Sequence, residues 1–147
     1  MERILVAVDG SETALKAVDF AANLAAQIDA SLILLSVVEE AYVADRALKE
    51  FARAEHFASA WGDLSEARAT EILIAAHERA AAFEGVRVVK EWRTGNPAAE
   101  IARYAKDNHA DLLVVGNAGH GRFAGVLLGS VAFKLLATVP CPLTVVR

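Results

Sequence analysis

The sequence predicts an α/β protein, a three-layer α/β/α sandwich built around a five-stranded parallel sheet. Five short apolar or β-branched segments alternate with segments of helical periodicity along the whole chain. Three of these segments are almost continuously hydrophobic, which is typical of strands that a parallel sheet buries on both faces. The expected strands span residues 4–8, 31–38, 86–92, 112–115 and 143–146.

Two motifs mark where helices begin. Ser11 stands before a stretch with apolar residues on one face, and it predicts the N-cap of a helix that runs to about residue 28. Asn96 followed by Pro97 predicts the cap and the first residue of a helix that ends near residue 108. Both helices follow predicted strands, as the crossovers of a parallel sheet require.

The stretch between the second and third strands is longer than one crossover needs. Residues 39–63 are predicted to form a variable helical excursion, with a mobile helix over 41–60 and an interruption at 61–63. A firm helix is expected over 64–83, and Gly85 is suited to close it.

Length and composition limit the classes of function. The 147 residues predict one domain, 1–147, without an internal repeat. Lys and Arg number 15 against 19 Asp and Glu, and the net charge of -4 argues against nucleic acid and anionic membranes as partners. No apolar run reaches the ~18 residues that a bilayer span needs, and the chain opens as a strand, so we expect a cytoplasmic protein.

The segment 115–131 carries the strongest functional signal. It is dense in glycine, including Gly116, Gly119 and Gly129, and it joins an apolar run to a helix that starts near Ser130. Glycines at such a turn let backbone N–H groups approach a ligand, and the helix dipole favours an anion. The pattern therefore predicts a phosphate site.

Two common phosphate motifs do not fit this segment. No Gly-Lys-Ser/Thr follows the glycines, which excludes a P-loop. Residues 119–124 match a relaxed dinucleotide fingerprint, but no Asp or Glu occurs after Asp111 to hold a ribose. The same lack of acids leaves this part of the chain positive, which suits a polyphosphate ligand.

The loops after the first and fourth strands are expected to form the site. In open α/β sheets, ligands bind outside the carboxyl ends of the strands. Asp9, Val37 and Gly116 lie at such ends. If the first and fourth strands are neighbours, the loops that follow them share one cleft.

Four motifs, in order along the chain, resemble those of the universal stress protein family. The spacing Gly116-x2-Gly119-x9-Gly129-Ser130 looks like the family's nucleotide-binding signature. Residues 4–11, 95–98 and 140–146 are similar to its opening strand and loop, its third crossover and its final strand. The resemblance covers nearly the whole chain except its variable region, and it implies a Rossmann-like fold that binds an adenine nucleotide.

The resemblance also implies which residues bind ATP, together with Mg²⁺. Residues at the ends of the first two strands would border adenine and ribose, the glycine loop would wrap ribose and phosphates, and the start of the next helix would hold the outer phosphates. The implied binding residues are Ala7, Asp9, Val37, Val115, Gly116, Asn117, Ala118, Gly119, His120, Gly121, Arg122, Gly129, Ser130 and Val131. Asn117-Ala118 and Ala132 depart from the family pattern, so we expect a weaker grip on phosphate.

The resemblance implies a regulator or sensor of the stress response that depends on ATP and acts on a protein partner that the sequence does not identify. Family members commonly form homodimers, and an exposed edge strand at 143–146 could pair with a second copy. Two alternatives stay open, a slow ATPase and a partner-binding module that no longer binds nucleotide. No catalytic residue is assigned, because the glycine loop holds no second titratable group to orient His120.

Overall fold

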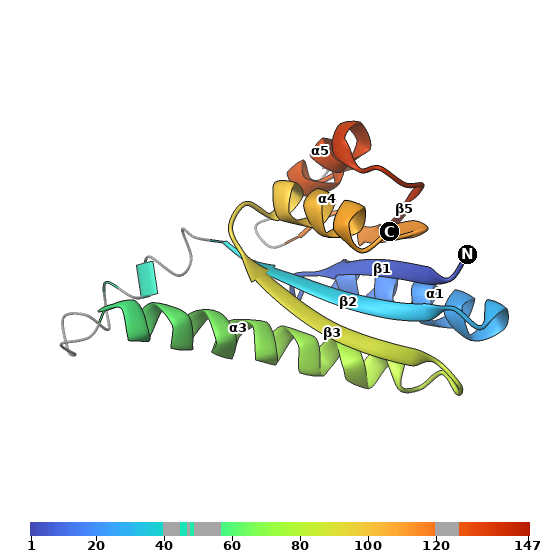
Figure 1. The fold of residues 1–147 in the computed structure, drawn as a ribbon, viewed down its shortest axis with the longest axis horizontal. Coiled ribbons are helices and arrows are strands. Elements are labelled where there is room, and N and C mark those ends of the chain that lie inside the picture. The colour runs from blue at the N-terminus through green and yellow to red at the C-terminus, as the bar shows by residue number, and fades with distance from the viewer. Residues whose placement is uncertain (40–44, 47, 49–56, 120–126) are drawn as a thin grey trace.

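The computed structural model describes residues 1–39, 45–46, 48, 57–119 and 127–147. Strands and helices alternate along these residues, as the sequence predicts (Figure 1). The elements are β1 (Arg3–Val8), α1 (Glu12–Ile28), β2 (Ser31–Val38), α3 (Phe57–Ala80), β3 (Arg87–Thr94), α4 (Pro97–Asp107), β4 (Leu112–Gly116), α5 (Ser130–Thr138) and β5 (Leu143–Val146).

The five strands form one sheet in the order β3-β2-β1-β4-β5, and every neighbouring pair is parallel. Figure 1 shows α4 and α5 on one face of this sheet and α1 and α3 on the other, which confirms the three-layer sandwich. The strand order reverses at β1, which pairs with β2 on one side and with β4 on the other. The crevice outside β1 and β4 is therefore the topological switch point where such sheets bind ligands.

Two hydrophobic cores hold the layers together, one on each face of the sheet. Alternation along β2 divides its side chains between them: Leu32 and Leu34 pack toward α1 and α3, while Ile33 and Leu35 pack toward α4 and α5. Burying one such side chain is worth roughly 1.5–3 kcal/mol. The strand β2 therefore packs against helices on both faces of the sheet, and its pairing with β1 aligns the carboxyl ends of the two strands.

Both predicted helix starts are confirmed. The Ser11 hydroxyl accepts a hydrogen bond from the Ala14 N–H at 3.3 Å at the start of α1, and the side-chain oxygen of Asn96 accepts one from the Ala99 N–H at 3.1 Å at the start of α4. Each cap satisfies an N–H group that has no partner within its helix. The caps thereby fix where the chain turns from strand into helix.

The predicted interruption at residues 61–63 is wrong. The helix α3 starts at Phe57, runs through Gly62 and ends at Ala80, three residues before the predicted end. One exposed glycine costs a helix only about 1 kcal/mol, which the surrounding alanines and the packing of α3 on β2 offset. Gly85, with φ of 80°, lies in the turn that follows. Residues 40–44, 47 and 49–56 of the predicted excursion lie outside the described residues.

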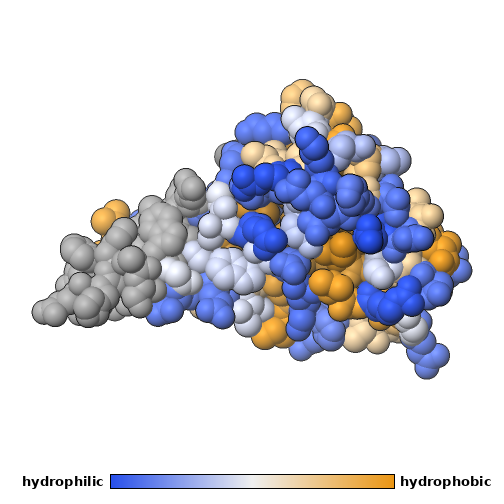
Figure 2. All heavy atoms as spheres, in the orientation of Figure 1, coloured by the Kyte–Doolittle hydropathy of each residue, from blue (hydrophilic) through white to orange (hydrophobic). Residues whose placement is uncertain are grey.

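The surface carries both polar and apolar side chains. In Figure 2 most of the visible face is hydrophilic, and hydrophobic atoms appear at the top of the view, over α5, and in patches near the middle and at the right. Phe133 and Leu136 of α5 are 67% and 59% exposed. Among the residues described, no helix combines the length and hydrophobicity that a bilayer span needs.

Candidate nucleotide site

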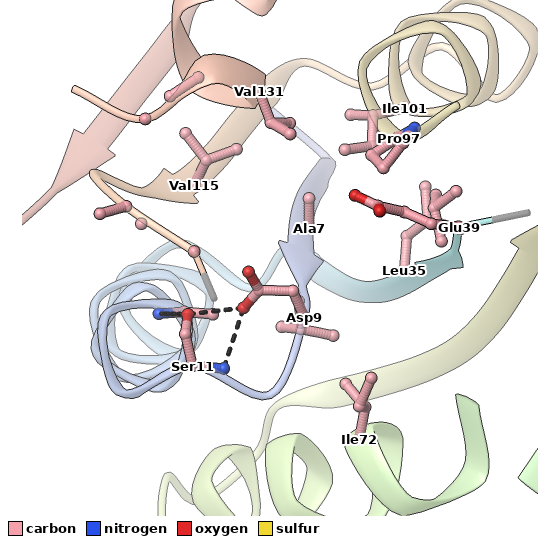
Figure 3. A pocket seen from close by; sticks show the side chains of 18 of the residues that line it. Ala7, Asp9, Ser11, Leu35, Glu39, Ile72, Pro97, Ile101, Val115 and Val131 are labelled. Carbon is pink, nitrogen blue, oxygen red and sulfur yellow. Dashed lines mark hydrogen bonds between the residues drawn. The ribbon is translucent and has the colours of Figure 1, made fainter. Parts of the chain in front are cut away.

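A cavity of about 690 Å³ opens at the carboxyl ends of the strands, at the switch point of the sheet (Figure 3). Its walls come from β1, β2 and β4, from the first turns of α1, α4 and α5, and from the middle of α3. The lining residues are Ala7, Val8, Asp9, Ser11, Ala14, Leu35, Val37, Val38, Glu39, Arg68, Ile72, Pro97, Ile101, Val115, Gly116, Ala118, Gly119, Gly129, Ser130, Val131 and Ala132.

Asp9 is fixed by the turn from β1 into α1. Its Oδ1 accepts hydrogen bonds from the N–H of Ser11 at 2.9 Å and from the Ser11 hydroxyl at 2.5 Å, drawn as dashed lines in Figure 3. The same hydroxyl caps α1, so cap and carboxylate form one connected unit. The turn therefore presents a carboxylate of defined orientation at the floor of the cavity.

The loop after β4 packs directly on the start of α1. A Cβ at Gly116 would lie 2.7 Å from the carbonyl carbon of Thr13 and 2.9 Å from the nitrogen of Ala14, so only glycine permits this approach. The Thr13 hydroxyl donates a hydrogen bond to the carbonyl of Ala118. At the next residue, a Cβ on Gly119 would overlap Oδ2 of Asp9. The loops after β1 and β4 therefore share one cleft, as predicted for neighbouring strands.

The start of α5 completes this side of the cavity. Its N-cap is Gly129, which makes no side-chain capping bond, and Ser130 is the first helical residue. The Gly129 N–H donates to the carbonyl of Asn117 at 2.5 Å, which ties this helix start to the loop after β4. Backbone N–H groups at a helix start, together with the helix dipole, form a site for an anion.

The other side of the cavity is apolar. Ala7 of β1 and Leu35 of β2 face Pro97 and Ile101 of α4 across it (Figure 3). Val37 of β2 also lines the cavity. An apolar slot with a few polar groups at one end is the usual form of a small-molecule site. The cavity thus has an apolar end beside β2 and a polar end beside α5.

The cavity brings together ten of the fourteen sequence-predicted site residues. They are Ala7, Asp9, Val37, Val115, Gly116, Ala118, Gly119, Gly129, Ser130 and Val131. Asn117 is not among the lining residues; it is buried, and its amide donates to the carbonyl of Leu127 at 3.4 Å. Of the residues described, none bonds its Oδ1. His120, Gly121 and Arg122 lie outside the described residues.

Several lining residues were not predicted. Pro97 and Ile101 belong to a helix that the sequence did identify, and their position after an expected strand was the available signal. Arg68 and Ile72 come from α3, and Glu39 comes just after β2. Their place in the cavity depends on the path of the chain between β2 and β3, for which the sequence has no comparable motif.

The polar groups of the cavity do not form a metal centre on their own. Within the part of the chain that the structure describes, no three His, Cys, Asp or Glu side chains come together to hold a metal ion. The acids that line the cavity, Asp9 and Glu39, come from different strand ends, and Arg68 forms an ion pair with Glu71 at 3.4 Å. The chemistry the cavity offers is hydrogen bonding, apolar contact and a helix N-terminus.

Known proteins are similar to this chain in sequence and in fold. The sequence model of the Universal stress protein family matches residues 1–147. Universal stress protein YxiE of Bacillus subtilis is 36% identical over 146 residues, which cover 99% of this chain and 98% of the relative. The solved structure of universal stress protein UspA from Lactobacillus plantarum is 28% identical, with a TM-score of 0.80 and coverage of 99% and 97%. A solved universal stress protein in complex with cAMP is also 28% identical, with a TM-score of 0.72 and coverage of 99% and 96%. The chain belongs to the universal stress protein family.

Proposed function

We propose that this protein binds ATP, with Mg²⁺, in the cavity at the switch point and acts in the cytoplasm as a nucleotide-dependent regulator or sensor of the stress response. One observation carries the proposal. An apolar slot, a fixed carboxylate and a helix N-terminus follow one another along a single cavity. These three features match the base, the ribose and the phosphates of a nucleotide in that order.

The base is assigned to the apolar end of the cavity. A purine ring is flat and largely apolar on its faces, so it suits the slot between Val37 on one side and Pro97 and Ile101 on the other. Ribose hydroxyls then come within reach of Asp9, because a carboxylate accepts hydrogen bonds. The length of the cavity from β2 to α5 sets the order of the three parts.

The phosphates are assigned to the start of α5. Ser130 and Val131, the first two helical residues, supply N–H groups there, and Ser130 adds a hydroxyl. No Asp or Glu occurs after Asp111 to repel an anion. Mg²⁺ keeps several waters and commonly binds through phosphates with one or two carboxylates. We assign it to the phosphates, with Asp9 as the nearest carboxylate of the cavity.

A relative supports the choice of an adenine nucleotide. One of the two solved universal stress proteins that are 28% identical to this chain was obtained in complex with cAMP. The same adenine and ribose fit the features on the β1 and β2 side of the present cavity. The choice of a triphosphate rests on the space and the N–H groups at the start of α5.

We also propose a homodimer through β5. This strand pairs with β4 on one side and forms the edge of the sheet on the other. The helix that precedes β5, α5, carries the exposed apolar side chains of Phe133 and Leu136. An antiparallel pairing of two β5 strands would continue the sheet across both copies. Light scattering after size exclusion tests this: a mass of two chains is expected, and a single-chain mass at every concentration contradicts it.

The nucleotide proposal is tested by calorimetric titration with Mg-ATP, alongside mass spectrometry of small molecules released when the purified protein is denatured. Ser130→Ala removes a hydroxyl at the start of α5 and is expected to weaken binding by about five- to tenfold. Thr138→Ala removes a hydroxyl from the far end of the same helix and serves as the control, with unchanged affinity.

The outcomes separate the candidate functions. Saturable binding that Ser130→Ala weakens supports the proposal, and release of phosphate during the titration would identify a slow ATPase. If no nucleotide is released and no binding heat or thermal shift appears with ATP, the protein is a partner-binding module and the proposal is wrong.

A further inference from the structure

Glu39 is an acid at the apolar end of the cavity. It follows directly after β2, and Figure 3 shows its side chain reaching back into the cavity, with the carboxylate pointing toward Ala7 between Leu35 and Pro97. The other acid of the lining, Asp9, already accepts two hydrogen bonds from Ser11 through Oδ1. Glu39 is therefore the carboxylate that faces the part of the ligand placed against β2.

The cavity is polarised along its length. The N-terminus of α5, with Ser130, attracts the negative end of a ligand, while Glu39 at the opposite end repels it. Arg68 also lines the cavity, and its guanidinium forms an ion pair with Glu71 at 3.4 Å. An anionic nucleotide therefore enters with its phosphates toward α5 and its base toward Glu39.

A carboxylate accepts hydrogen bonds and donates none. The side chain of Glu39 is exposed, so water solvates it until a base covers the slot. A base that displaces this water loses affinity unless it supplies a donor in its place. Adenine carries an amino group at position 6, whereas hypoxanthine and guanine carry a carbonyl oxygen there, which a carboxylate repels.

We infer that Glu39 of this protein selects adenine by accepting a hydrogen bond from the amino group at position 6 of the base. This inference rests on the proposed function, since it assumes a nucleotide in the cavity. It adds a specificity residue from outside the glycine loop and outside the apolar wall. It also explains how a slot of apolar side chains distinguishes purines of nearly equal shape.

The test compares ATP with ITP, which differ only in the groups at positions 6 and 1 of the base. Calorimetric titration of the wild-type protein is expected to show at least about tenfold tighter binding of ATP, the effect of one charge-assisted hydrogen bond. Glu39→Gln is expected to reduce this ratio to below about threefold, because its amide can donate to the carbonyl of hypoxanthine. Glu84→Gln makes the same charge change at an exposed turn outside the cavity and should leave the ratio unchanged.

GTP is the third nucleotide in the comparison. Guanine has the same carbonyl at position 6 as hypoxanthine and an extra amino group at position 2. Rejection of GTP along with ITP supports contact at position 6. Equal binding of ATP and ITP by the wild type, an unchanged ratio in Glu39→Gln, or retention of GTP overturns the inference while leaving nucleotide binding intact. A wild-type protein that binds none of the three nucleotides overturns the proposed function itself.

Discussion

Two glycines at the end of β4 and in the loop after it are expected to respond differently to an added methyl group, one by losing stability and the other by losing affinity for ATP. Neither Gly116 nor Gly119 has a positive φ, so the backbone conformation accepts alanine at both. At Gly116 the new Cβ meets the backbone of α1 at 2.7 Å, and ordinary contact begins at 3.4 Å. Closing that gap moves the start of α1 away from β4 by about 0.7 Å.

The cost of Gly116→Ala follows from what must move. The start of α1 is held by its Ser11 cap and by the buried face that begins at Ala14, so the shift disturbs packed structure. Overpacking of this kind costs roughly 1–3 kcal/mol of unfolding free energy. At Gly119 the atom in the way is Oδ2 of Asp9, and a small shift of this carboxylate strains its hydrogen bonds from Ser11 but moves no packed backbone. Gly119→Ala is therefore expected to cost less than about 1 kcal/mol and to displace the carboxylate assigned to ribose.

Urea denaturation, followed by circular dichroism, measures the first effect, and Mg-ATP titration measures the second. Gly116→Ala should lower the unfolding free energy by about 2 kcal/mol. Gly119→Ala should stay near wild type in stability and lose most of its affinity for ATP. Gly62→Ala is the control, because its Cβ meets nothing within 4 Å; it should stabilise α3 by roughly 0.5–1 kcal/mol. Equal destabilisation by the two loop variants would show that Gly119 packs as tightly as Gly116 does.

Three further predictions concern charges and the thiol. Two backbone N–H groups donate to Asp111 Oδ2 at 2.7 and 2.9 Å and lower the pKa of this carboxyl. The ionised carboxylate therefore stabilises the fold above the ordinary pKa near 3.9, and this contribution is lost as the pH falls through the lower pKa of the folded state. The difference in unfolding free energy between the wild type and Asp111→Asn should accordingly shrink as the pH is lowered. A difference that does not change with pH contradicts this. Burial raises the pKa of the Cys141 thiol, so thiol reagents at pH 7 should react with it more slowly than with a free cysteine, and an equal rate would count against that burial. The half-exposed pair of Arg79 and Asp19 joins α3 to α1, and Asp19→Asn should cost below about 1 kcal/mol in urea denaturation; a larger loss would show a buried pair.

Most of the fold could be predicted from the sequence because its signals are local. Hydrophobic runs identified all five strands, and the residues Ser11, Asn96 and Pro97 identified two helix starts. The expectation that β1 and β4 share a cleft was conditional on their pairing, which the sheet order confirms. The error at residues 61–63 has a local cause too: a lone glycine weakens a helix without ending it when α3 packs on the sheet.

The site was predictable only where it follows strand ends. Asp9 directly follows β1, Gly119 lies in the loop after β4, and Ser130 begins the helix that follows this loop, so their place in one cavity followed from topology. Glu39 and Arg68 reach the cavity through the path of the chain between β2 and β3, which no local pattern determines. The packing of Gly116 against Thr13 of α1 could not be predicted either, because it joins residues about a hundred positions apart in the sequence.

Nucleotide binding in the cavity is tested most directly by ¹H–¹⁵N chemical-shift mapping during titration with Mg-ATP. We expect saturable shifts of amides at residues 7–9, 37–39, 115–116, 118–119 and 129–131, which line the cavity at the switch point. Amides at residues 105–111, at another surface hollow, should not move. Shifts confined to that second region, or no shifts at all at saturating ATP, would contradict the claim that this cavity binds a nucleotide.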